Sequence, residues 1–199
     1  NRSQSTVLVF DNTLSFDKKF KKHALSAVAV SSYTNSDYTY SYQSVSHFFS
    51  SDIHTLNAGN KISQGNGTKA SQWAIMSYAF RAVYNYDSKY MVTANMRADG
   101  SSKLAPGNRW GVFPSVSAGW RISSEKFMQD LTWLNDLKLR GGWGQTGNQS
   151  GIGDYAYLQL YNITRQNWWE EGKANAMVTL SPSNMPNRDL TWETTAQTN

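Results

Sequence analysis

Strict alternation of apolar and polar residues over long segments is the feature that most constrains the fold of this chain. In the segment 90–99, one side of a strand would carry Tyr90, Val92, Ala94, Met96 and Ala98. The other side would carry Thr93, Asn95, Arg97 and Asp99. Because strand side chains point alternately to opposite faces, this segment predicts one continuous apolar wall and one charged wall. A membrane-spanning β-barrel, with lipid outside and water inside, has this pattern.

The same alternation recurs in the segments 4–16, 24–33, 73–86, 112–123 and 137–144. Four arginines all fall on the polar side of their segments: Arg81, Arg97, Arg121 and Arg140. An arginine facing lipid at the middle of a bilayer would cost roughly 2–4 kcal/mol, so this agreement supports the assignment of the two faces. We therefore expect these four side chains to line the lumen of a barrel.

The connections between these segments alternate in length. Short ones are expected at 17–23, 87–89 and 124–136, and long ones at 34–71, 100–111 and 148–186. Outer-membrane barrels show this asymmetry between short periplasmic turns and long external loops. The fold class predicted is therefore all-β, an antiparallel transmembrane β-barrel. Smaller features are also expected: strand pieces at 38–45, 155–164 and 176–180, and a helical turn within 124–136, where Phe127, Leu131 and Leu134 recur at helical spacing.

A soluble β-sandwich, whose apolar face would pack against a second sheet, is the structural alternative. Strands in soluble proteins average about 5–6 residues. The alternating segments here reach 14 residues, as in 73–86. Aromatic residues make up 14% of the chain, which suits a barrel with aromatic girdles at the membrane surfaces.

Composition and spacing exclude several other classes of protein. The chain has no cysteine, and its three histidines lack companions at metal-ligand spacing, so no metal site and no cofactor is expected. The net charge is +5, but the basic residues are scattered, which disfavours a nucleic-acid partner. Gly142–Gly147 fits G-x-G-x-x-G, yet loop-like sequence rather than a helix follows it. With no nucleophile beside a base, we do not expect an enzyme.

Two long segments carry a resemblance to a known family. MRADGSSKLAPGNRWGVFPSVSAGWRISSEKFM and LKLRGGWGQTGNQSGIGDY resemble the C-terminal barrel region of SusC/RagA-type TonB-dependent outer-membrane transporters, and NRDLTWETTAQTN resembles a later segment of that family. The matching positions are Arg97, Asp99, Gly100, Ser101, Ser102, 107–111, Phe113, Pro114, Ser115, Trp120, Arg140 and 144–148. Leu104 departs from the pattern, because the family commonly has an aromatic residue there.

The resemblance implies a barrel of about 22 strands with a plugged lumen, to which residues 1–199 would contribute about nine or ten strands. The plug domain and the TonB box would lie outside this chain, which we expect to be a piece of a longer one. It also implies location in the outer membrane of a Gram-negative cell and uptake of oligosaccharides or peptides. The implied partners are a SusD-like surface lipoprotein acting as a lid and the TonB–ExbB–ExbD complex, which supplies energy.

Two alternatives stay open at the level of function. Within transport, the chain would belong to a siderophore or cobalamin receptor. Outside transport, it would be a secreted, aromatic-rich carbohydrate-binding β-module. That module would be soluble and independently folded, whereas a barrel segment with open edges and a lipid face would need detergent.

Candidate substrate-binding residues lie in the predicted external loops. They form two groups: Trp168, Trp169 and Glu170, and Asn108, Arg109 and Trp110. Indole faces pack against sugar rings, while neighbouring polar side chains can hydrogen-bond to hydroxyl groups. A girdle or loop-packing role is the simpler interpretation of Trp110. The inward arginines are expected to contact the plug and to pair with its carboxylates rather than to select substrate.

Overall fold

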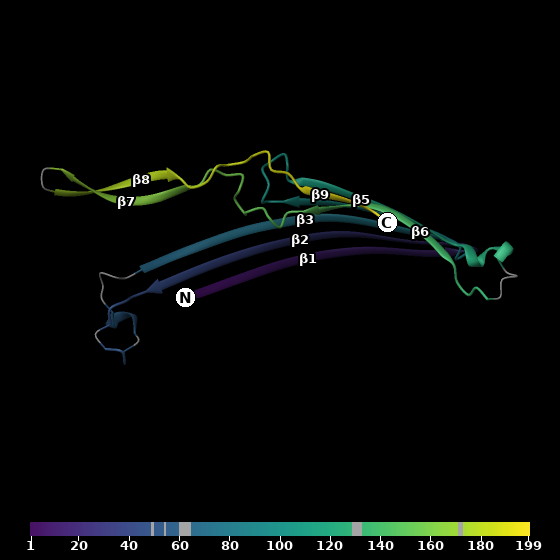
Figure 1. Ribbon diagram of the computed structural model, residues 1–199, viewed down its shortest axis with the longest axis horizontal. Coiled ribbons are helices and arrows are strands. Elements are labelled where there is room, and N and C mark those ends of the chain that lie inside the picture. Colours follow the sequence, from purple (N-terminus) through teal and green to yellow (C-terminus); the bar gives the residue numbers. More distant parts are fainter. Residues whose placement is uncertain (49, 54, 60–64, 129–132, 171–172) are drawn as a thin grey trace.

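The computed structural model describes residues 1–48, 50–53, 55–59, 65–128, 133–170 and 173–199, and the side chains of residues 165–176 are outside this description. The strands are β1 (Arg2–Phe20), β2 (His23–Ser44), β3 (Gly65–Tyr86), β4 (Tyr90–Ser101), β5 (Trp110–Arg121), β6 (Lys138–Asn148), β7 (Tyr161–Glu170), β8 (Lys173–Pro182) and β9 (Glu193–Thr198). Seven of them form one antiparallel sheet in the order β1-β2-β3-β4-β5-β6-β9 (Figure 1). The predicted all-β antiparallel fold is therefore confirmed.

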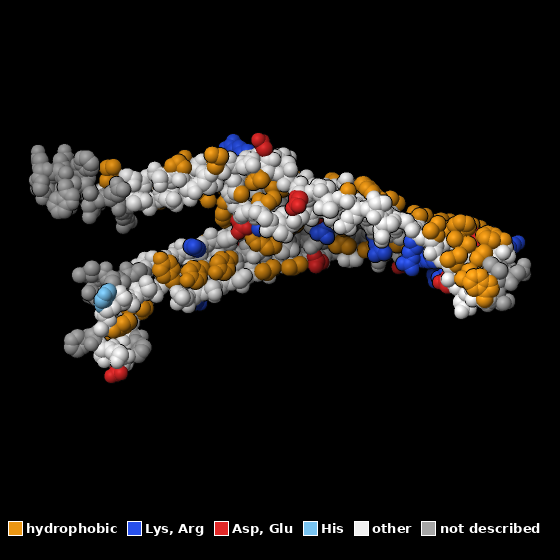
Figure 2. Space-filling model, in the orientation of Figure 1, with side chains coloured by type: hydrophobic (Ala, Val, Ile, Leu, Met, Phe, Trp, Pro, Cys, Tyr) orange, Lys and Arg blue, Asp and Glu red, His pale blue; other side chains and the backbone are white. Residues whose placement is uncertain are grey.

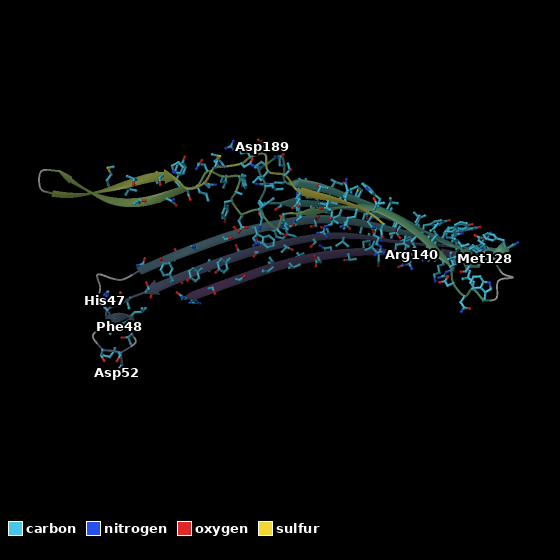
Figure 3. The ribbon with its side chains drawn as sticks, in the orientation of Figure 1. His47, Phe48, Asp52, Met128, Arg140 and Asp189 are labelled. Carbon is cyan, nitrogen blue, oxygen red and sulfur yellow. The ribbon has the colours of Figure 1, made fainter. Side chains whose placement is uncertain are left out.

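Successive connections lie at alternate ends of the sheet, and the two shortest, 21–22 and 87–89, share one end, here called the short-turn end. At one end, β1 and β2 are joined by residues 21–22, β3 and β4 by 87–89, and β5 and β6 by 122–137. At the other end are the long β2–β3 loop and the segment between β6 and β9. Figure 3 shows His47 and Asp52 beyond this second end and Met128 at the first. The predicted alternation of short and long connections holds for 21–22, 45–64, 87–89 and 149–192, but it was wrong for one pair: the β5–β6 connection (122–137) is longer than the β4–β5 loop (102–109).

The β5–β6 connection contains two short 3-10 turns, η3 (Ile122–Ser124) and η4 (Lys126–Met128). The sequence predicted a helical turn within 124–136, and η4 partly meets that prediction because it includes Phe127. Leu131, the second residue of the predicted spacing, lies outside the described residues.

The loop predicted over 34–71 was too long at both ends, although the strand piece expected within it at 38–45 was confirmed as the last part of β2. Strand β2 continues to Ser44, and β3 already begins at Gly65, which pairs with Ser44. Backbone hydrogen bonds hold this extension together, and they require no apolar side chains. Because polar residues such as Ser, Thr, Gln and Lys occupy both faces here, the alternation of hydropathy that marks the rest of the sheet is weak.

Strands β7 and β8 form a separate two-stranded ribbon between β6 and β9 (Figure 1). Asn184 clamps its base: its Oδ1 accepts a hydrogen bond from Leu160 N at 2.7 Å, and its Nδ2 donates to Leu158 O at 2.7 Å. The chain then returns to the sheet, where Thr198 of β9 pairs with Trp143 of β6. The predicted total of about nine or ten strands thus includes two that lie outside the main sheet.

The sheet has almost no interior of its own. Among the described residues, the buried hydrophobic side chains are Leu104, Ala105 and Phe113. The accessible surface is 15191 Å². A compact monomer of this size would expose roughly 9,400 Å². In the described parts of the chain, no helix has both the length and the apolar character needed to cross a bilayer. The apolar face of the sheet is therefore not covered by another part of this chain.

Two rows of stacked aromatic rings cross the apolar face. Tyr90 lies between Tyr86 and Trp120, with ring centroids 6.2 and 6.4 Å apart, near the short-turn end. Tyr78 stacks on Trp110 at 6.0 Å, farther along the same face. The two rows are separated by eight residues on β3 and ten on β5. Tilted strands of about 9–11 residues cross a bilayer, so the rows mark a span of the expected length. Figure 2 shows hydrophobic side chains gathered toward the short-turn end.

Glu125 links the β5–β6 connection to the aromatic row of Tyr86, Tyr90 and Trp120. Its carboxylate accepts hydrogen bonds from Tyr90 Oη at 2.7 Å and Trp120 Nε1 at 3.2 Å, and it lies 3.1 Å from Lys89 Nζ. Donation first from Tyr90 and then from Trp120 and Lys89 holds the pKa of Glu125 below its ordinary value of 4.5. A lowered folded-state pKa means that Glu125 stabilises the turn above pH 4.5, and that this contribution is lost as pH falls through the lowered value.

We expect the indole N–H signal of Trp120, in a tryptophan-labelled sample of the full protein, to shift in one step as the pH falls below 4.5. The Glu125→Gln variant removes the titrating group and should show no such step. A midpoint at or above 4.5 in the unsubstituted protein would show that the three donors do not favour the carboxylate.

Candidate functional site

The register of the sheet places Arg81, Arg97, Arg121 and Arg140 on one face, as the sequence predicted. Residues directly opposite each other on neighbouring strands share a face. The pairs Arg81–Asn95, Arg97–Phe113, Arg121–Lys138 and Gly119–Arg140 link β3, β4, β5 and β6 in this way. We call this side of the sheet the polar face. Figure 3 shows Arg140 on β6, nearer the short-turn end than the loops.

Arg97 and Asp99 form an ion pair on the polar face. Arg97 Nε lies 2.8 Å from Oδ1 and 2.7 Å from Oδ2 of Asp99, and Arg97 Nη2 donates to Ser77 Oγ at 3.3 Å. The Asp99 side chain is 9% exposed, whereas that of Arg97 is 58% exposed. One acidic residue thus neutralises the arginine while leaving much of its guanidinium open to the space above the sheet.

A hollow of about 510 Å³ lies beside this pair on the polar face. Its lining residues are Ile75, Asn95, Arg97, Asp99, Phe113, Ser115, Gln145, Thr146, Gly147, Asn148, Gln149, Ser150 and Trp192. Asn95 Nδ2 donates to Ser115 Oγ at 2.9 Å, which fixes two of the polar groups at its floor. Amide, hydroxyl and guanidinium groups around two aromatic rings can hold a polar ligand or a polar protein segment.

Phe113 and Trp192 form the aromatic wall of this hollow. Their rings meet edge to face, with centroids 5.5 Å apart, and Trp192 Nε1 donates to Arg109 O at 2.8 Å. Gly147 lies under the Phe113 ring, and a Cβ at Gly147 would collide with it. The sequence analysis did not single out Phe113 and Trp192 as site residues, although both belong to the segments that carry the family resemblance.

Asn108 and Arg109 of the predicted site hold the β4–β5 loop (102–109) in place. Arg109 Nε donates to the backbone carbonyl of Leu104 at 3.2 Å, and the Leu104 side chain is fully buried. Asn108 Nδ2 donates to Arg188 O at 3.1 Å and so ties this loop to the segment before β9. These two polar groups therefore serve loop-to-loop contacts in this structure.

Trp110 lies on the opposite, apolar face. Its ring covers Gly100, where a Cβ would come within 2.8 Å of the indole, and it stacks on Tyr78. Trp110 is 54% exposed, as a residue of an aromatic girdle would be before lipid covers it. The structure does not bring Trp110 together with the hollow of the polar face.

Trp168, Trp169 and Glu170 lie at the far end of β7, next to the tip of the β7–β8 ribbon. Their side chains fall outside the described part of the structure, so the geometry of this group is not defined. The backbone pairs Trp168 with Asn175 and Trp169 with Ala174. The ribbon places this group apart from Asn108, Arg109 and Trp110.

Asp154 latches the start of the β6–β9 segment to the extension of β3. It accepts a hydrogen bond from Ser71 Oγ and lies 3.0 Å from Lys103 Nζ, while Tyr155 Oη accepts from Gln72 N at 3.0 Å. Burial raises the pKa of Asp154, but donation from Ser71 and Lys103 outweighs this effect and leaves the pKa below its ordinary value of 3.8. The latch covers the edge of β3 where β4 no longer pairs with it.

Comparison with known proteins identifies several relatives. The chain is 36% identical over 191 residues to TonB-dependent receptor P39 of Formosa agariphila, covering 95% of this chain and 18% of that receptor. It is 39% identical over 130 residues to TonB-dependent receptor SusC of Bacteroides thetaiotaomicron, covering 65% of this chain and 13% of the relative. No protein-family model matches the chain.

Solved structures show the same fold over nearly the whole chain. The structure of the RagAB peptide transporter superposes with a TM-score of 0.85 at 29% identity, covering 98% of this chain and 21% of that one. The RagAB peptide importer in its closed-closed state gives a TM-score of 0.86 at the same identity. The chain thus spans about a fifth of the length of the curated receptor P39 and of these solved chains.

Proposed function

This chain belongs to the SusC/RagA-type TonB-dependent receptors, and on that premise we propose that it forms part of the barrel wall of an outer-membrane nutrient importer. Residues 1–199 would contribute barrel strands and external loop elements, and the plug domain and TonB box would be supplied by other parts of the whole protein. The imported nutrient would be an oligosaccharide or a peptide, and no catalytic step is part of this function.

The segregation of charge between the two faces of the sheet is the observation that carries this proposal. Arg81, Arg97, Arg121 and Arg140 share one face with Asp99, while the two aromatic rows lie on the other. A wall between lipid and water requires this division. The large accessible surface disfavours the secreted carbohydrate-binding module, which would bury its apolar face in a core.

The polar face would meet both the plug and the passing substrate. Arg81 and Arg140 form no salt bridge with any described residue, whereas Arg97 is bound to Asp99 and Arg121 lies 3.4 Å from Asp136. Unpaired cations facing a closed lumen favour carboxylates on a plug. Pairing with plug carboxylates is therefore the role proposed for Arg81 and Arg140, in preference to selection of substrate.

The external loops would capture substrate together with a SusD-like surface lipoprotein, and TonB–ExbB–ExbD would drive its release inward. The ribbon that carries Trp168, Trp169 and Glu170 projects from the loop end of the sheet (Figure 1), as a capture element would. Asn108, Arg109 and Trp110 would support the loop and the girdle. The siderophore or cobalamin receptor remains the alternative within transport.

The test uses the full-length protein in its native cell. We expect it in the outer-membrane fraction, and we expect uptake of labelled oligosaccharide or peptide pools to fall about tenfold or more when its gene, the adjacent lipoprotein gene or TonB is deleted. Fluorescent pools of both chemical classes, assayed separately, distinguish the two substrates. Uptake that is unchanged by these deletions, or a protein found in the soluble fraction, would contradict the proposal.

A further inference from the structure

Three tyrosines occupy every second position in the part of β2 that extends beyond the aromatic row of Tyr78 and Trp110. Tyr38, Tyr40 and Tyr42 lie opposite Ser71, Lys69 and Gly67 of β3, respectively. The register of β2 with β3 is continuous from His23 to Ser44, and Val28 lies opposite Arg81. Residues separated by an even number of positions share a face. These three tyrosines, here called the tyrosine ladder, therefore belong to the polar face.

The rings of Tyr38 and Tyr42 are exposed to solvent, and stacking and contact with Gly67 hold the ladder in place. Tyr40 and Tyr42 stack with centroids 6.1 Å apart and an interplanar angle of 29°. Tyr38 is 41% exposed and Tyr42 is 37% exposed. Gly67 leaves room for the Tyr42 ring to lie against the backbone of β3, because a Cβ at Gly67 would collide with that ring. The result is a flat aromatic track along one strand.

Two common explanations for exposed aromatics do not apply to this track. Girdle residues face lipid, and the rows of Tyr90 and Tyr78 occupy the opposite face of the sheet. A hydrophobic core is absent here, because the residues opposite the tyrosines are Ser3 and Ser5 on β1 and Ser71, Lys69 and Gly67 on β3. The residues directly opposite the rings thus offer serine hydroxyls and the Lys69 ammonium, and the Ser71 hydroxyl among them already donates to Asp154.

The surroundings of the ladder favour a sugar over a peptide. Strand β2 is paired on both edges, with β1 and β3, so an extended peptide cannot join it as an added strand. The ladder has no deep pocket for peptide side chains, but it offers ring faces at a repeat of about 6.7 Å and hydroxyl donors and acceptors between them. Ring faces pack against the C–H faces of sugars, and the polar groups can reach their hydroxyls.

We propose that the tyrosine ladder, Tyr38, Tyr40 and Tyr42, is a binding track for a neutral oligosaccharide on the polar face of the external extension of the barrel wall. This inference rests on the proposed function, because it takes the polar face as the side along which substrate passes. Lys69, Ser3 and Ser5 bind sugar hydroxyl groups, and the rings support successive sugar units. The ladder is distinct from the ribbon that carries Trp168 and Trp169.

The test measures binding to the purified full-length receptor in detergent. The probes are neutral hexasaccharides of α-1,4-glucan, β-1,4-glucan, β-1,4-xylan and α-mannan, with a tryptic peptide pool beside them. At least one hexasaccharide should bind. The triple variant Tyr38→Ala/Tyr40→Ala/Tyr42→Ala should weaken its Kd about 10- to 100-fold, as expected for loss of aromatic anchors. The triple Tyr→Phe variant keeps the rings and should stay within about threefold.

The opposite-face variant Thr39→Ala/Ser41→Ala/Gln43→Ala is the matched control and should bind as the unsubstituted protein does. If the triple alanine variant fails to reach the membrane, Tyr38→Ala and Tyr42→Ala carry the test singly, each with an expected loss of about 3- to 10-fold. Unchanged sugar binding in the alanine variants, or binding of peptides alone, would overturn the proposal that the tyrosine ladder binds an oligosaccharide. If the ladder proposal fails in this way but the protein takes up a peptide in a TonB-dependent manner, the proposed importer function is still supported.

Discussion

Replacing Met96 by arginine is expected to destabilise the assembled barrel and to lower its folded fraction in the outer membrane. Met96 lies on the apolar face opposite Phe80 and Pro114, between the two aromatic rows, and is 56% exposed. Arginine facing lipid near the bilayer midplane costs about 2–4 kcal/mol. That is a large fraction of the stability of a typical folded protein. The measurement is the folded fraction of the full-length protein in the outer membrane, read from heat-modifiable gel mobility.

The matched control is Thr93→Arg, which adds the same side chain to the polar face of the same strand. Thr93 lies opposite Val83 and Ser117, on the side that already carries Arg81 and Arg97. We expect near-normal assembly of this variant, because a lumen-facing charge keeps its water. Equal folded fractions for the two variants would show that the faces are assigned wrongly, and with them the membrane-spanning interpretation of the sheet.

Truncating Leu104 to alanine is expected to loosen the β4–β5 loop more than any other loop substitution of similar size. Leu104 is 0% exposed, the most buried large apolar side chain described here, and Arg109 Nε donates to its backbone carbonyl. Removing a buried leucine side chain costs about 2–5 kcal/mol. Since the loop folds around this residue, we expect amide exchange of residues 102–109 to rise about 30-fold or more, measured by mass spectrometry.

Leu158→Ala is the control for that experiment, because Leu158 is 39% exposed and lies in a connecting segment. Its exchange should rise little. The contacts of Trp192 with Arg109 and of Asn108 with Arg188 should loosen together with the loop in Leu104→Ala. Unaltered exchange over 102–109 would mean that the loop is held by these outer contacts and not by its buried leucine.

Much of the sheet could be predicted because a wall between lipid and water repeats a simple rule. Alternation in 90–99 identified both faces of β4, and the same rule assigned Arg81, Arg121 and Arg140 to one face. Short turns were also predictable: Lys21, Asp87 and Ser88 adopt positive φ angles of 50°, 52° and 56°, which polar turn residues tolerate.

The sequence did not predict features that depend on contacts between polar residues from different strands and loops. The extension of β3 has polar side chains on both faces and was assigned to a loop, whereas the extension of β2 was expected as a separate strand piece at 38–45 and not as a continuation of the strand 24–33. The tyrosines of the ladder fall within that expected strand piece, but their shared face was not recognised as a candidate site, although Tyr at positions 38, 40 and 42 is itself a period of two. The hollow beside Arg97 was missed for another reason: Trp192 comes to it from a distant segment.

The sequential order of the strands has a consequence for how this wall forms. From β1 to β6 each strand pairs with the next one in the chain, so hairpins can close one after another with little loss of entropy. Strand β9 must wait for the segment 149–192 to return, and each doubling of a loop costs about 0.6 kcal/mol. The latch at Asp154 and the clamp at Asn184 shorten that search. We therefore expect assembly to pause at β6, with its open edge as the site most exposed to mispairing.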